Sequence, residues 1–324
     1  MFGRNTGVVT GIDVGAASVK AVRMNIKGKS SVLMGAAVAE LAPDDDATPA
    51  GGGDREARLV DAIKAVFDEV GGSTQDTIVA SIGGASVSVK HVIFPKMTKQ
   101  ALAESIHWEA RKHIPFGESD FVLDFQIMNG GRSEDGNMSV LLAAVETKAV
   151  DRLLKVLGKA GIEPDTIDIN PLALMNEADE EGLIDGETVA VVEVGATTLT
   201  LAVYRRGGLF FTRSVPLGRD TNGASRGPTT VPTDSSWVER TLNEVRRSLN
   251  YYNNETGKRG IERIYLTGGR VLDASIRQAF QEKTGIATNI LDPLEKVETS
   301  GVELGALSSQ GPRLAVAMGL ARRM

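Results

Sequence analysis

The strongest constraint on the fold is a short pattern that occurs twice in the chain. Each copy has an apolar run, an acidic residue, a turn of glycine and small residues, and a second β-rich run, at residues 11–22 and 192–203. Two short strands around a glycine-bearing turn are the usual structure of such runs. The acids Asp13 and Glu193 have the same separation in sequence as the glycines Gly15 and Gly195. We therefore expect an internal duplication, with a similar hairpin at the start of each half.

The chemistry of the two turns indicates a ligand that carries phosphate. Glycine lets backbone N–H groups come close to phosphate oxygens, and Ser18, Thr197 and Thr198 add hydroxyl donors. The acids Asp13 and Glu193 are suited to holding water molecules around a Mg²⁺ ion. One such turn alone is equally compatible with an ordinary tight hairpin. Because the turn is repeated, the pattern favours two loops that face each other across a nucleotide polyphosphate.

Composition limits the class of protein. The chain has 324 residues, enough for about two domains, and a net charge of −6 with a pI near 5.3. This charge argues against nucleic acid as the main partner, although it leaves room for a local basic patch. The sequence contains no cysteine, no apolar run of bilayer-spanning length and no signal peptide at its start. We therefore expect a cytoplasmic protein without a disulfide framework.

In the first half, the pattern predicts strands and one helix around the first hairpin. A strand is expected at residues 31–39, an amphipathic helix at 58–70 and a buried strand at 77–82. Residues 43–53 contain Pro, Gly and three consecutive Asp residues. That composition is typical of an exposed loop, and we do not assign its Asp residues to a metal site.

Residues 83–161 have a different pattern, which predicts a compact β-α-β-β-α insertion. Its strands are expected at 87–94, 121–128 and 138–145, and its helices at 99–114 and 148–161. Apolar and polar residues alternate over 121–127, as in a sheet with one covered face. All three histidines of the chain, His91, His107 and His113, lie in this part. Their spacing matches no metal site, so we interpret them as exposed or structural.

The rest of the chain predicts a connection and a second half. We expect the two halves to be linked by a strand at 167–169 and a helix at 171–181. After its hairpin, the second half is predicted to continue with a strand at 209–215, a loop at 218–235, a helix at 237–252 and a strand at 261–266. That last strand leads into Gly268 and Gly269, where backbone can approach a flat ligand such as adenine. The small residues of the C-terminal run, 314–324, suit packing on a sheet better than insertion into a membrane surface.

The order of these elements resembles the actin/Hsp70/sugar-kinase superfamily. Within it, residues 106–116 (Ile-His-Trp-Glu-Ala-Arg-Lys-His-Ile-Pro-Phe) and 122–126 are similar to the family of the type IV pilus assembly protein PilM, a relative of the division protein FtsA. Residues 193–198 and 244–252 resemble further segments of that family. The resemblance covers most of the chain. It implies an α/β, actin-like (RNase H-like) duplicated two-lobed fold with an inserted FtsA/PilM-type subdomain.

The resemblance also implies domain boundaries. The first actin-like lobe would consist of residues 1–82, 162–187 and the C-terminal helix 312–324. The inserted subdomain would be residues 83–161, and the second lobe residues 188–311.

ATP and Mg²⁺ are the ligands that the resemblance implies. Asp13 and Glu193 would be the catalytic acids and would hold the metal through water. The turns after these acids would be the two phosphate loops, and the Gly-Gly loop and the long helix would line the adenosine. The cofactor-binding residues implied in this way are Gly15, Ala16, Ala17, Ser18, Lys20, Gly195, Ala196, Thr197, Thr198, Glu244, Arg247, Ser248, Gly268, Gly269 and Arg270.

As a function, the resemblance implies a cytoplasmic ATP-binding scaffold of a type IV pilus or related secretion machine. A groove beside the insertion would receive the N-terminal cytoplasmic peptide of a PilN-like inner-membrane protein and so tether the chain to the inner face of the membrane. ATP would close the two halves and shape this groove, and self-association is a further possibility.

Two departures from the family pattern bear on catalysis. Glu193 stands where the family usually has Asp, and its carboxylate is carried one methylene further, in a site where placement governs rate. The region after Gly218 is shorter than usual and loop-like. We therefore expect ATP binding with at most slow hydrolysis.

Two alternative functions remain compatible with the sequence. One is a phosphotransferase or ATPase of the sugar-kinase type, for which Asp168 is the candidate base and a solvated strand-end acid the simpler interpretation. The other is an FtsA-like polymer-forming division protein, which would be expected to carry a C-terminal membrane-targeting helix.

Overall fold

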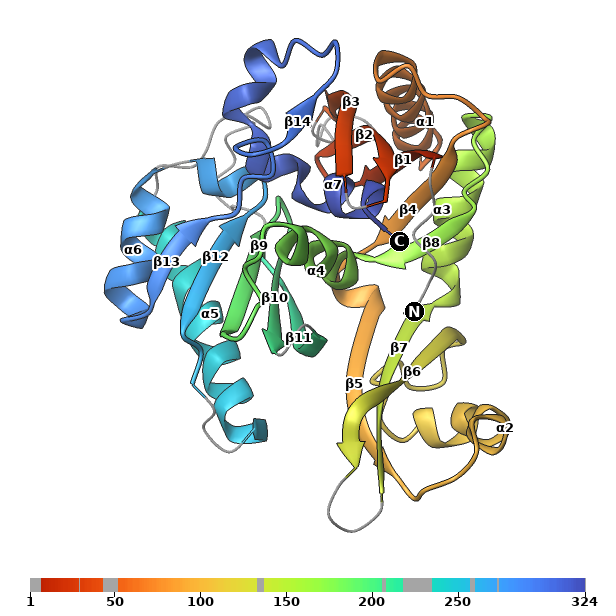
Figure 1. Cartoon of the computed structure of the whole chain (residues 1–324), viewed down its shortest axis with the longest axis vertical. Coiled ribbons are helices and arrows are strands. Elements are labelled where there is room, and N and C mark those ends of the chain that lie inside the picture. The colour runs from red at the N-terminus through yellow and green to blue at the C-terminus, as the bar shows by residue number, and fades with distance from the viewer. Residues whose placement is uncertain are drawn as a thin grey trace.

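The computed structural model describes residues 7–28, 30–42, 52–132, 137–205, 208–217, 235–256, 260–272 and 274–323. Two of the expected loops fall mostly outside these ranges, namely residues 43–51 and 218–234. The described residues form three β-sheets with helices packed between and around them (Figure 1).

The first sheet begins with the first hairpin. Its strands are β1 (Gly7–Val14), β2 (Ser18–Lys27), β3 (Ser30–Glu40), β4 (Thr77–Ile82) and β8 (Thr166–Ile169), with β14 (Glu298–Thr299) added at one edge. The order across the sheet is β14-β3-β2-β1-β4-β8. β2 runs antiparallel to both β1 and β3, whereas β4 is parallel to β1 and β8 is parallel to β4.

The second sheet repeats this plan. Its strands are β9 (Thr188–Val194), β10 (Thr198–Arg205), β11 (Gly208–Pro216), β12 (Arg263–Thr267) and β13 (Ala287–Ile290), in the order β11-β10-β9-β12-β13. Here too the first three strands form an antiparallel meander, and the next two strands run parallel to the first. The two sheets therefore share one strand order, which confirms the duplication that the repeated hairpins indicate.

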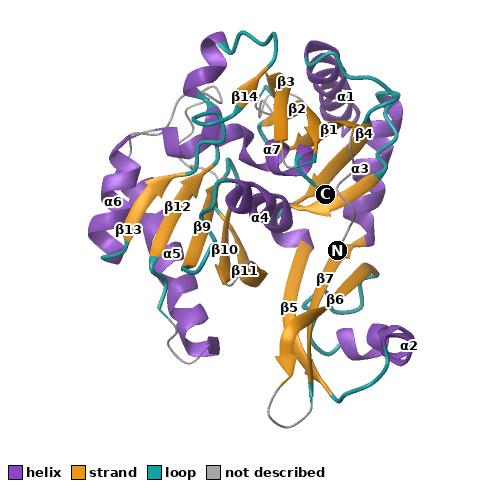
Figure 2. Cartoon of the chain, in the orientation of Figure 1, coloured by secondary structure: helices purple, strands orange, loops and turns teal. Residues whose placement is uncertain are grey.

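The helices form layers with these two sheets (Figure 2). α1 (Gly52–Glu69) and α3 (Thr147–Lys159) cover one face of the first sheet, and α5 (Ser235–Thr256) and α6 (Ala274–Thr284) cover one face of the second. α4 (Asn170–Glu180) and α7 (Ala315–Ala321) pack in the core that lies between the sheets. All seven residues of α7 are buried, as expected for a packing helix.

The third sheet belongs to the insertion. It has the order β5-β7-β6, with β5 (Val87–Phe94), β6 (Phe121–Arg132) and β7 (Met138–Glu146). One face is covered by α2 (Lys99–Ala110), and the expected alternation along β6 is present, with residues 121, 123, 125 and 127 half-buried against that helix. The buried residues of α3, Leu153, Val156 and Leu157, lie in the core formed with α1 and the first sheet, and Val87 and Val145 of the insertion strands pack against the same core. α3 therefore joins the insertion to the first sheet, and its expected place in the insertion stays a prediction.

Several helix boundaries differ from the predictions. α1 begins at Gly52 rather than at residue 58, because its first turns precede the apolar periodicity on which the prediction was based. α2 ends at Ala110 rather than at residue 114. Pro115 disfavours helical geometry at the residue before it, and residues 111–113 form turns instead. α5 extends at both ends, to Ser235 and Thr256.

Two glycines allow α7 to pack at the centre. A Cβ atom on Gly11 of β1 would lie 2.2 Å from the carbonyl oxygen of Ala317. A Cβ atom on Gly319 would lie 1.9 Å from the carbonyl oxygen of Ala173 in α4. Only residues without a side chain fit at these positions, so α7 is held against the first hairpin on one side and against α4 on the other.

Candidate functional site

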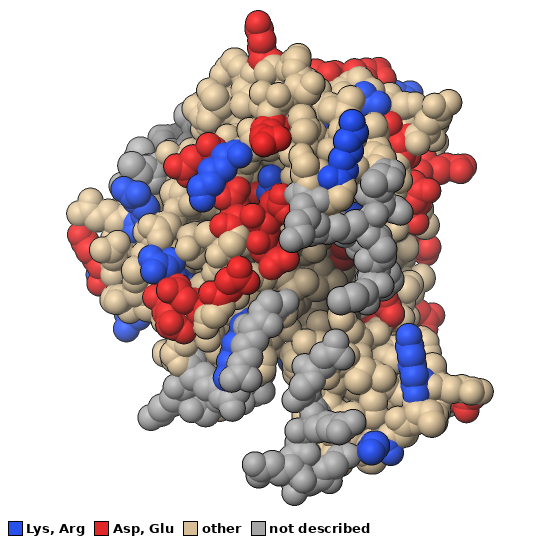
Figure 3. Space-filling view, viewed as in Figure 1, with Lys and Arg blue, Asp and Glu red and all other residues tan. Residues whose placement is uncertain are grey.

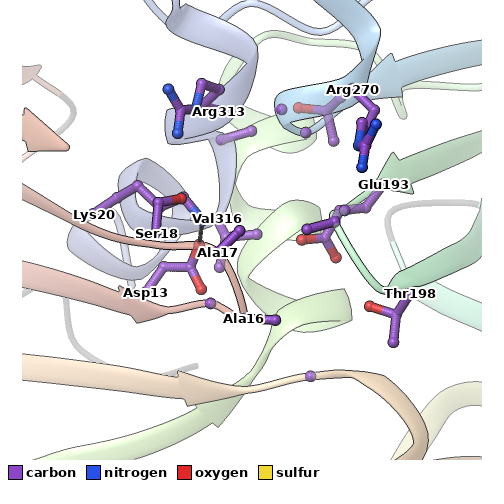
Figure 4. Close-up of a pocket in the computed structure, with 18 of the residues that line it drawn as sticks. Asp13, Ala16, Ala17, Ser18, Lys20, Glu193, Thr198, Arg270, Arg313 and Val316 are labelled. Carbon is purple, nitrogen blue, oxygen red and sulfur yellow. Dashed lines mark hydrogen bonds and ion pairs between the residues drawn. The ribbon is translucent and has the colours of Figure 1, made fainter. Parts of the chain in front are cut away.

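A cavity of about 770 Å³ lies where the two sheets meet. The turns after Asp13 and after Glu193 face each other across it (Figure 4). Most of the predicted site residues line this cavity, namely Asp13, Gly15, Ala16, Ala17, Ser18, Lys20, Glu193, Gly195, Ala196, Thr197, Thr198, Gly268, Gly269 and Arg270.

The two turns have the same hydrogen-bond pattern. The N–H of Gly15 donates to the carbonyl of Ser18 at 3.0 Å, and the N–H of Gly195 donates to the carbonyl of Thr198 at 2.9 Å. A Cβ atom on Gly15 would lie only 2.9 Å from the Ser18 oxygen, so the absence of a side chain keeps the first turn narrow. Because both turns end a strand at the cavity, each brings its backbone to the same space from its own lobe.

Asp13 is buried near the end of β1, with 6% of its surface exposed. Lys20 stands opposite it in the β1–β2 register, and its Nζ atom lies 2.9 Å from Oδ2 of Asp13. In the second hairpin, the residue opposite Glu193 is Thr200. The duplication has therefore kept an acid in both turns, whereas the lysine is present in the first hairpin only.

Glu193 lies at the corresponding place in β9 and is half-buried. Its neighbourhood raises the pKa of this carboxyl from 4.5 to about 7, mainly because burial disfavours the charged form. The negative charge of Asp13 acts in the same direction, while Lys20 and a hydrogen bond from Asn170 oppose it. Near neutral pH, Glu193 therefore exchanges readily between its neutral and charged forms.

Asn170 is a cavity residue that the sequence analysis did not identify. It is the first residue of α4, and its side chain accepts a hydrogen bond from Ser81 of β4 at 2.9 Å. Its Nδ2 atom donates to the carboxylate of Glu193, at 3.4 and 3.5 Å from the two oxygens. One feature of the sequence could have indicated this position. Pro171 directly follows Asn170 after a short strand, and because Pro is favoured in the first turn of a helix, the pair marks a helix N-terminus there.

The Gly-Gly loop also lines the cavity, and a Cβ atom on Gly269 would lie 3.7 Å from Nε of Arg313. Gly268 has a φ of 98°, and a Cβ atom there would lie 2.6 Å from the carbonyl oxygen of Val194. Its N–H donates to the carbonyl of Pro312 at 2.9 Å. The guanidinium of Arg270 lies 5.2 Å from the ring centroid of Trp237, which helps to hold that side chain.

The segment before α7 supplies further cavity residues that the sequence analysis missed. Gln310, Pro312 and Arg313 line the cavity, and Arg313 forms an ion pair with Glu40 at the end of β3. No pattern in the sequence marks these residues, because they come from an irregular stretch far along the chain from either hairpin.

Three predicted residues lie outside the set that lines the cavity. These are Glu244, Arg247 and Ser248 of α5. Glu244 and Arg247 form an ion pair with each other, and Ser248 is fully buried. The structure therefore does not bring these three side chains together with the two turns.

Asp168 also lies outside the cavity lining. It is buried rather than solvated, contrary to the simpler expectation for a strand-end acid, with 7% of its surface exposed. Its Oδ2 atom lies 3.2 Å from Nε of Arg323, and its Oδ1 atom accepts a hydrogen bond from the Ile169 N–H at 2.7 Å. Burial raises the pKa of this carboxyl, and Arg323 counteracts the rise. These contacts are those of a structural acid.

The three histidines, all within the described residues, do not mark a second site. His91 is held between the insertion and the second lobe, with Nε2 3.1 Å from the carbonyl oxygen of Leu209, whereas His107 and His113 are exposed. Within the described part of the chain, no group of three or more His, Cys, Asp or Glu residues is placed to hold a metal ion. On the face in Figure 3, acidic side chains gather near the middle and basic ones are scattered.

Comparison with known proteins identifies relatives of the chain. A family model described as type IV pilus assembly protein PilM matches residues 11–223 and 235–324. A solved "PilM-PilN type IV pilus biogenesis complex" contains a chain that is 23% identical, with 98% of each chain covered and a TM-score of 0.80. The ethanolamine utilization protein EutJ from Carboxydothermus hydrogenoformans is 13% identical, with 98% and 89% covered and a TM-score of 0.49.

A protein from Bacteroides thetaiotaomicron, described as having an actin-like ATPase fold and unknown function, is 11% identical, with 90% and 93% covered and a TM-score of 0.49. The strand order of the two sheets and the similarity to the chain from the PilM-PilN complex confirm the expected α/β, actin-like duplicated fold. Among the helices that the structure describes, none has the length and apolar character needed to cross a membrane.

Proposed function

Because the chain belongs to the family of the type IV pilus assembly protein PilM, we propose that it is a nucleotide-binding scaffold of a pilus assembly complex. ATP with Mg²⁺ binds in the cavity between the two turns, and a peptide from a PilN-like membrane protein binds beside the insertion. The observation that carries the nucleotide assignment is the pair of turns with matching hydrogen bonds, which bring two backbones and two carboxylates to one cavity.

The residues around the cavity fit a magnesium nucleotide. Glycine and small residues at both turns leave backbone N–H groups accessible to phosphate oxygens, and Lys20 supplies a cation on the first side. Asp13 and Glu193 offer oxygen atoms, the ligands that Mg²⁺ prefers, and would act through its bound water. The ion would neutralise phosphate charge. Gly268 and Gly269 would lie against the adenosine, with Arg270 beside them.

The arrangement of acidic residues in and near the cavity favours ATP binding over rapid ATP hydrolysis. Glu193 carries its carboxylate one methylene further than the Asp that is usual in the family, in a site where placement governs rate. Asp168, the candidate base of a phosphotransferase, is paired with Arg323 outside the cavity lining. These observations disfavour the sugar-kinase alternative. The full burial of α7 gives no support to this helix acting as an FtsA-like membrane anchor.

The proposed peptide site lies between the insertion and the first lobe. β6 is an edge strand of the insertion sheet, and Val122, on the face opposite α2, has 51% of its surface exposed. Asp124, two residues further along the same face of β6, is also exposed. The related solved chain comes from a complex described as PilM-PilN, which supports a partner of this kind. Such a partner would hold the chain at the inner face of the membrane.

A pull-down with the immobilised cytoplasmic N-terminal peptide of a PilN-like neighbour tests this function. We expect the peptide to retain the wild-type chain, and the retained amount to change when ATP and Mg²⁺ are added. Val122→Glu should lower retention, and Leu154→Glu, which alters an exposed apolar residue on α3, is the matched control. Failure of folded protein to bind the peptide with and without ATP would contradict the proposed partner.

A further inference from the structure

Arg313 is a buried cation at the cavity, in the short helix η4 (Gly311–Leu314) just before α7. Only 9% of its side chain is exposed. One end of its guanidinium is paired with Oε1 of Glu40 at 2.5 Å, and the other donates to Oε1 of Gln310 at 2.7 Å. In Figure 4 the side chain lies on the same side of the cavity as Ser18 and Lys20.

Glu40 places this guanidinium near the first turn. It is the last residue of β3 and stands opposite Ser18 in the β2–β3 register. The next residue, Leu41, donates its N–H to the carbonyl of Ala17 in the turn itself, at 2.8 Å. Arg313 is therefore attached to the strand end that supports the first turn, although it is far away in sequence.

Lys20 and Arg313 share one arrangement. Each is a cation at the edge of the cavity, and each is paired with a carboxylate of the first lobe, Lys20 with Asp13 and Arg313 with Glu40. The Lys20–Asp13 pair is largely shielded from solvent, which carries a desolvation cost, whereas in the second pair Arg313 is shielded and the side chain of Glu40 is 32% exposed. A polyphosphate brings several negative charges into the same space, and guanidinium groups bind phosphate with two parallel hydrogen bonds.

We propose that Arg313 is a phosphate ligand of the nucleotide and that Glu40 competes with the nucleotide for it. In the structure Glu40 holds the guanidinium, and on binding the phosphates take its place. This inference rests on the proposed function, because it assigns a further residue to the same cavity. It predicts opposite effects for the two partners of one ion pair, which a purely structural pair would not produce.

Calorimetric titration of ATP with Mg²⁺ into four proteins tests the proposal. These are the wild type, Arg313→Gln, Glu40→Gln and the control Arg263→Gln, which breaks an Arg–Glu pair with Glu187 outside the cavity lining. Arg313→Gln should weaken ATP binding by about tenfold to a hundredfold, the size expected for a lost charge-assisted contact. Glu40→Gln should strengthen binding, and Arg263→Gln should leave it unchanged.

Titration with adenosine separates a phosphate contact from a base contact. Arg313→Gln should leave the affinity for adenosine unchanged if the guanidinium binds phosphate. Equal losses for ATP and adenosine, weaker ATP binding in Glu40→Gln, or no effect of Arg313→Gln would each overturn the inference while leaving nucleotide binding intact. Absence of ATP binding in folded wild-type protein would overturn the proposed function and this inference together. Thermal unfolding of each variant checks that it is folded.

Discussion

The amide of Asn170 donates a hydrogen bond to the carboxylate of Glu193 across the boundary between the two lobes, at 3.4 Å. Asn170 also accepts a hydrogen bond from Ser81 of the first sheet, so one side chain connects strand β4 with strand β9. The N-terminus of α4 is thus tied to both acid-bearing parts of the fold. Tyr204 adds a second tie, because its hydroxyl donates to the carbonyl of Pro171 at 2.7 Å.

This connection predicts that Asn170 positions Glu193 for the metal. In Asn170→Ala the carboxylate loses its amide donor, and we expect the affinity for ATP with Mg²⁺ to fall by roughly tenfold to a hundredfold, as for other groups that orient metal-binding residues. Ser81→Ala removes the other hydrogen bond of Asn170 and leaves its contact with Glu193 in place. It should have a clearly smaller effect on affinity, and equal losses in the two variants would argue against a positioning role.

The raised pKa of Glu193 predicts pH-dependent metal binding. Below about pH 7 the carboxyl is mostly protonated, so Mg²⁺ must displace a proton and the observed affinity falls. Titration of ATP with Mg²⁺ should therefore show stronger binding at about pH 8 than at about pH 6. Glu193→Gln, which cannot titrate, should show little change over this range apart from the titration of ATP itself, which a parallel titration without Mg²⁺ measures.

A buried contact between Glu177 of α4 and Arg322, the residue just after α7, predicts a pH dependence of stability. Nη1 of Arg322 lies 2.6 Å from Oε1 of Glu177, which is fully buried, and burial raises the pKa of Glu177 from 4.5 to about 8. Between these two values the folded state holds a proton that the unfolded state has lost. Stability therefore falls as the pH rises through this range, by up to about 1.4 kcal/mol per pH unit.

Denaturant unfolding of the wild type and of Glu177→Gln at about pH 6, 7 and 8 tests this prediction. At each pH, the difference between their free energies of unfolding measures the contribution of Glu177. Glutamine mimics the neutral carboxyl, so the free energy of unfolding of the variant should depend less on pH. Relative to the wild type, the variant should therefore become more stable as the pH rises. An identical pH dependence in the two proteins would mean that Glu177 does not keep its proton in the folded state.

Because α7 and α4 approach each other closely, adding one methyl group between them should strongly lower the stability of the protein. Gly319→Ala would place Cβ 1.9 Å from the carbonyl oxygen of Ala173, and we expect a loss of roughly 2 kcal/mol or more in the free energy of unfolding. The control is Gly158→Ala in α3, where nothing lies within 4 Å of the added atom. That change should stabilise the protein by roughly 0.5–1 kcal/mol, because alanine favours a helix more than glycine does. A mild effect of Gly319→Ala would show that the two helices separate easily.

Local patterns were sufficient to predict most of the fold. The two hairpins, the strand–glycine–helix unit at Gly268 and the alternation along β6 each depend on neighbours in sequence, and the structure has all three. The packing of α3 could not be predicted in this way, because its apolar face would suit either sheet. The edge strand β14 is too short to carry a pattern, since its two residues pair with β3 from a distant part of the chain.

The sequence predicts the residues that line the cavity where the repeat marks them and misses those that only long-range contacts bring there. Asp13, Glu193 and the turn residues follow from the repeated hairpin. Asn170, Glu40 and Arg313 come from three other elements, and only folding brings them to the cavity. The place of Arg247 near the ribose rests on the family resemblance alone and stays a prediction: in the structure its side chain is paired with Glu244 and does not line the cavity.

Nucleotide binding between the two turns is the central claim, and calorimetric titration of ATP with Mg²⁺ tests it most directly. Wild-type protein should bind one ATP per chain. Gly15→Val should abolish the signal, because the added side chain would crowd Ser18 and Lys20 in the first turn. At 100 times the dissociation constant, the ligand should also stabilise the wild type by about 2.7 kcal/mol. Folded wild-type protein that gives neither binding heat nor a rise in its unfolding temperature would contradict the account.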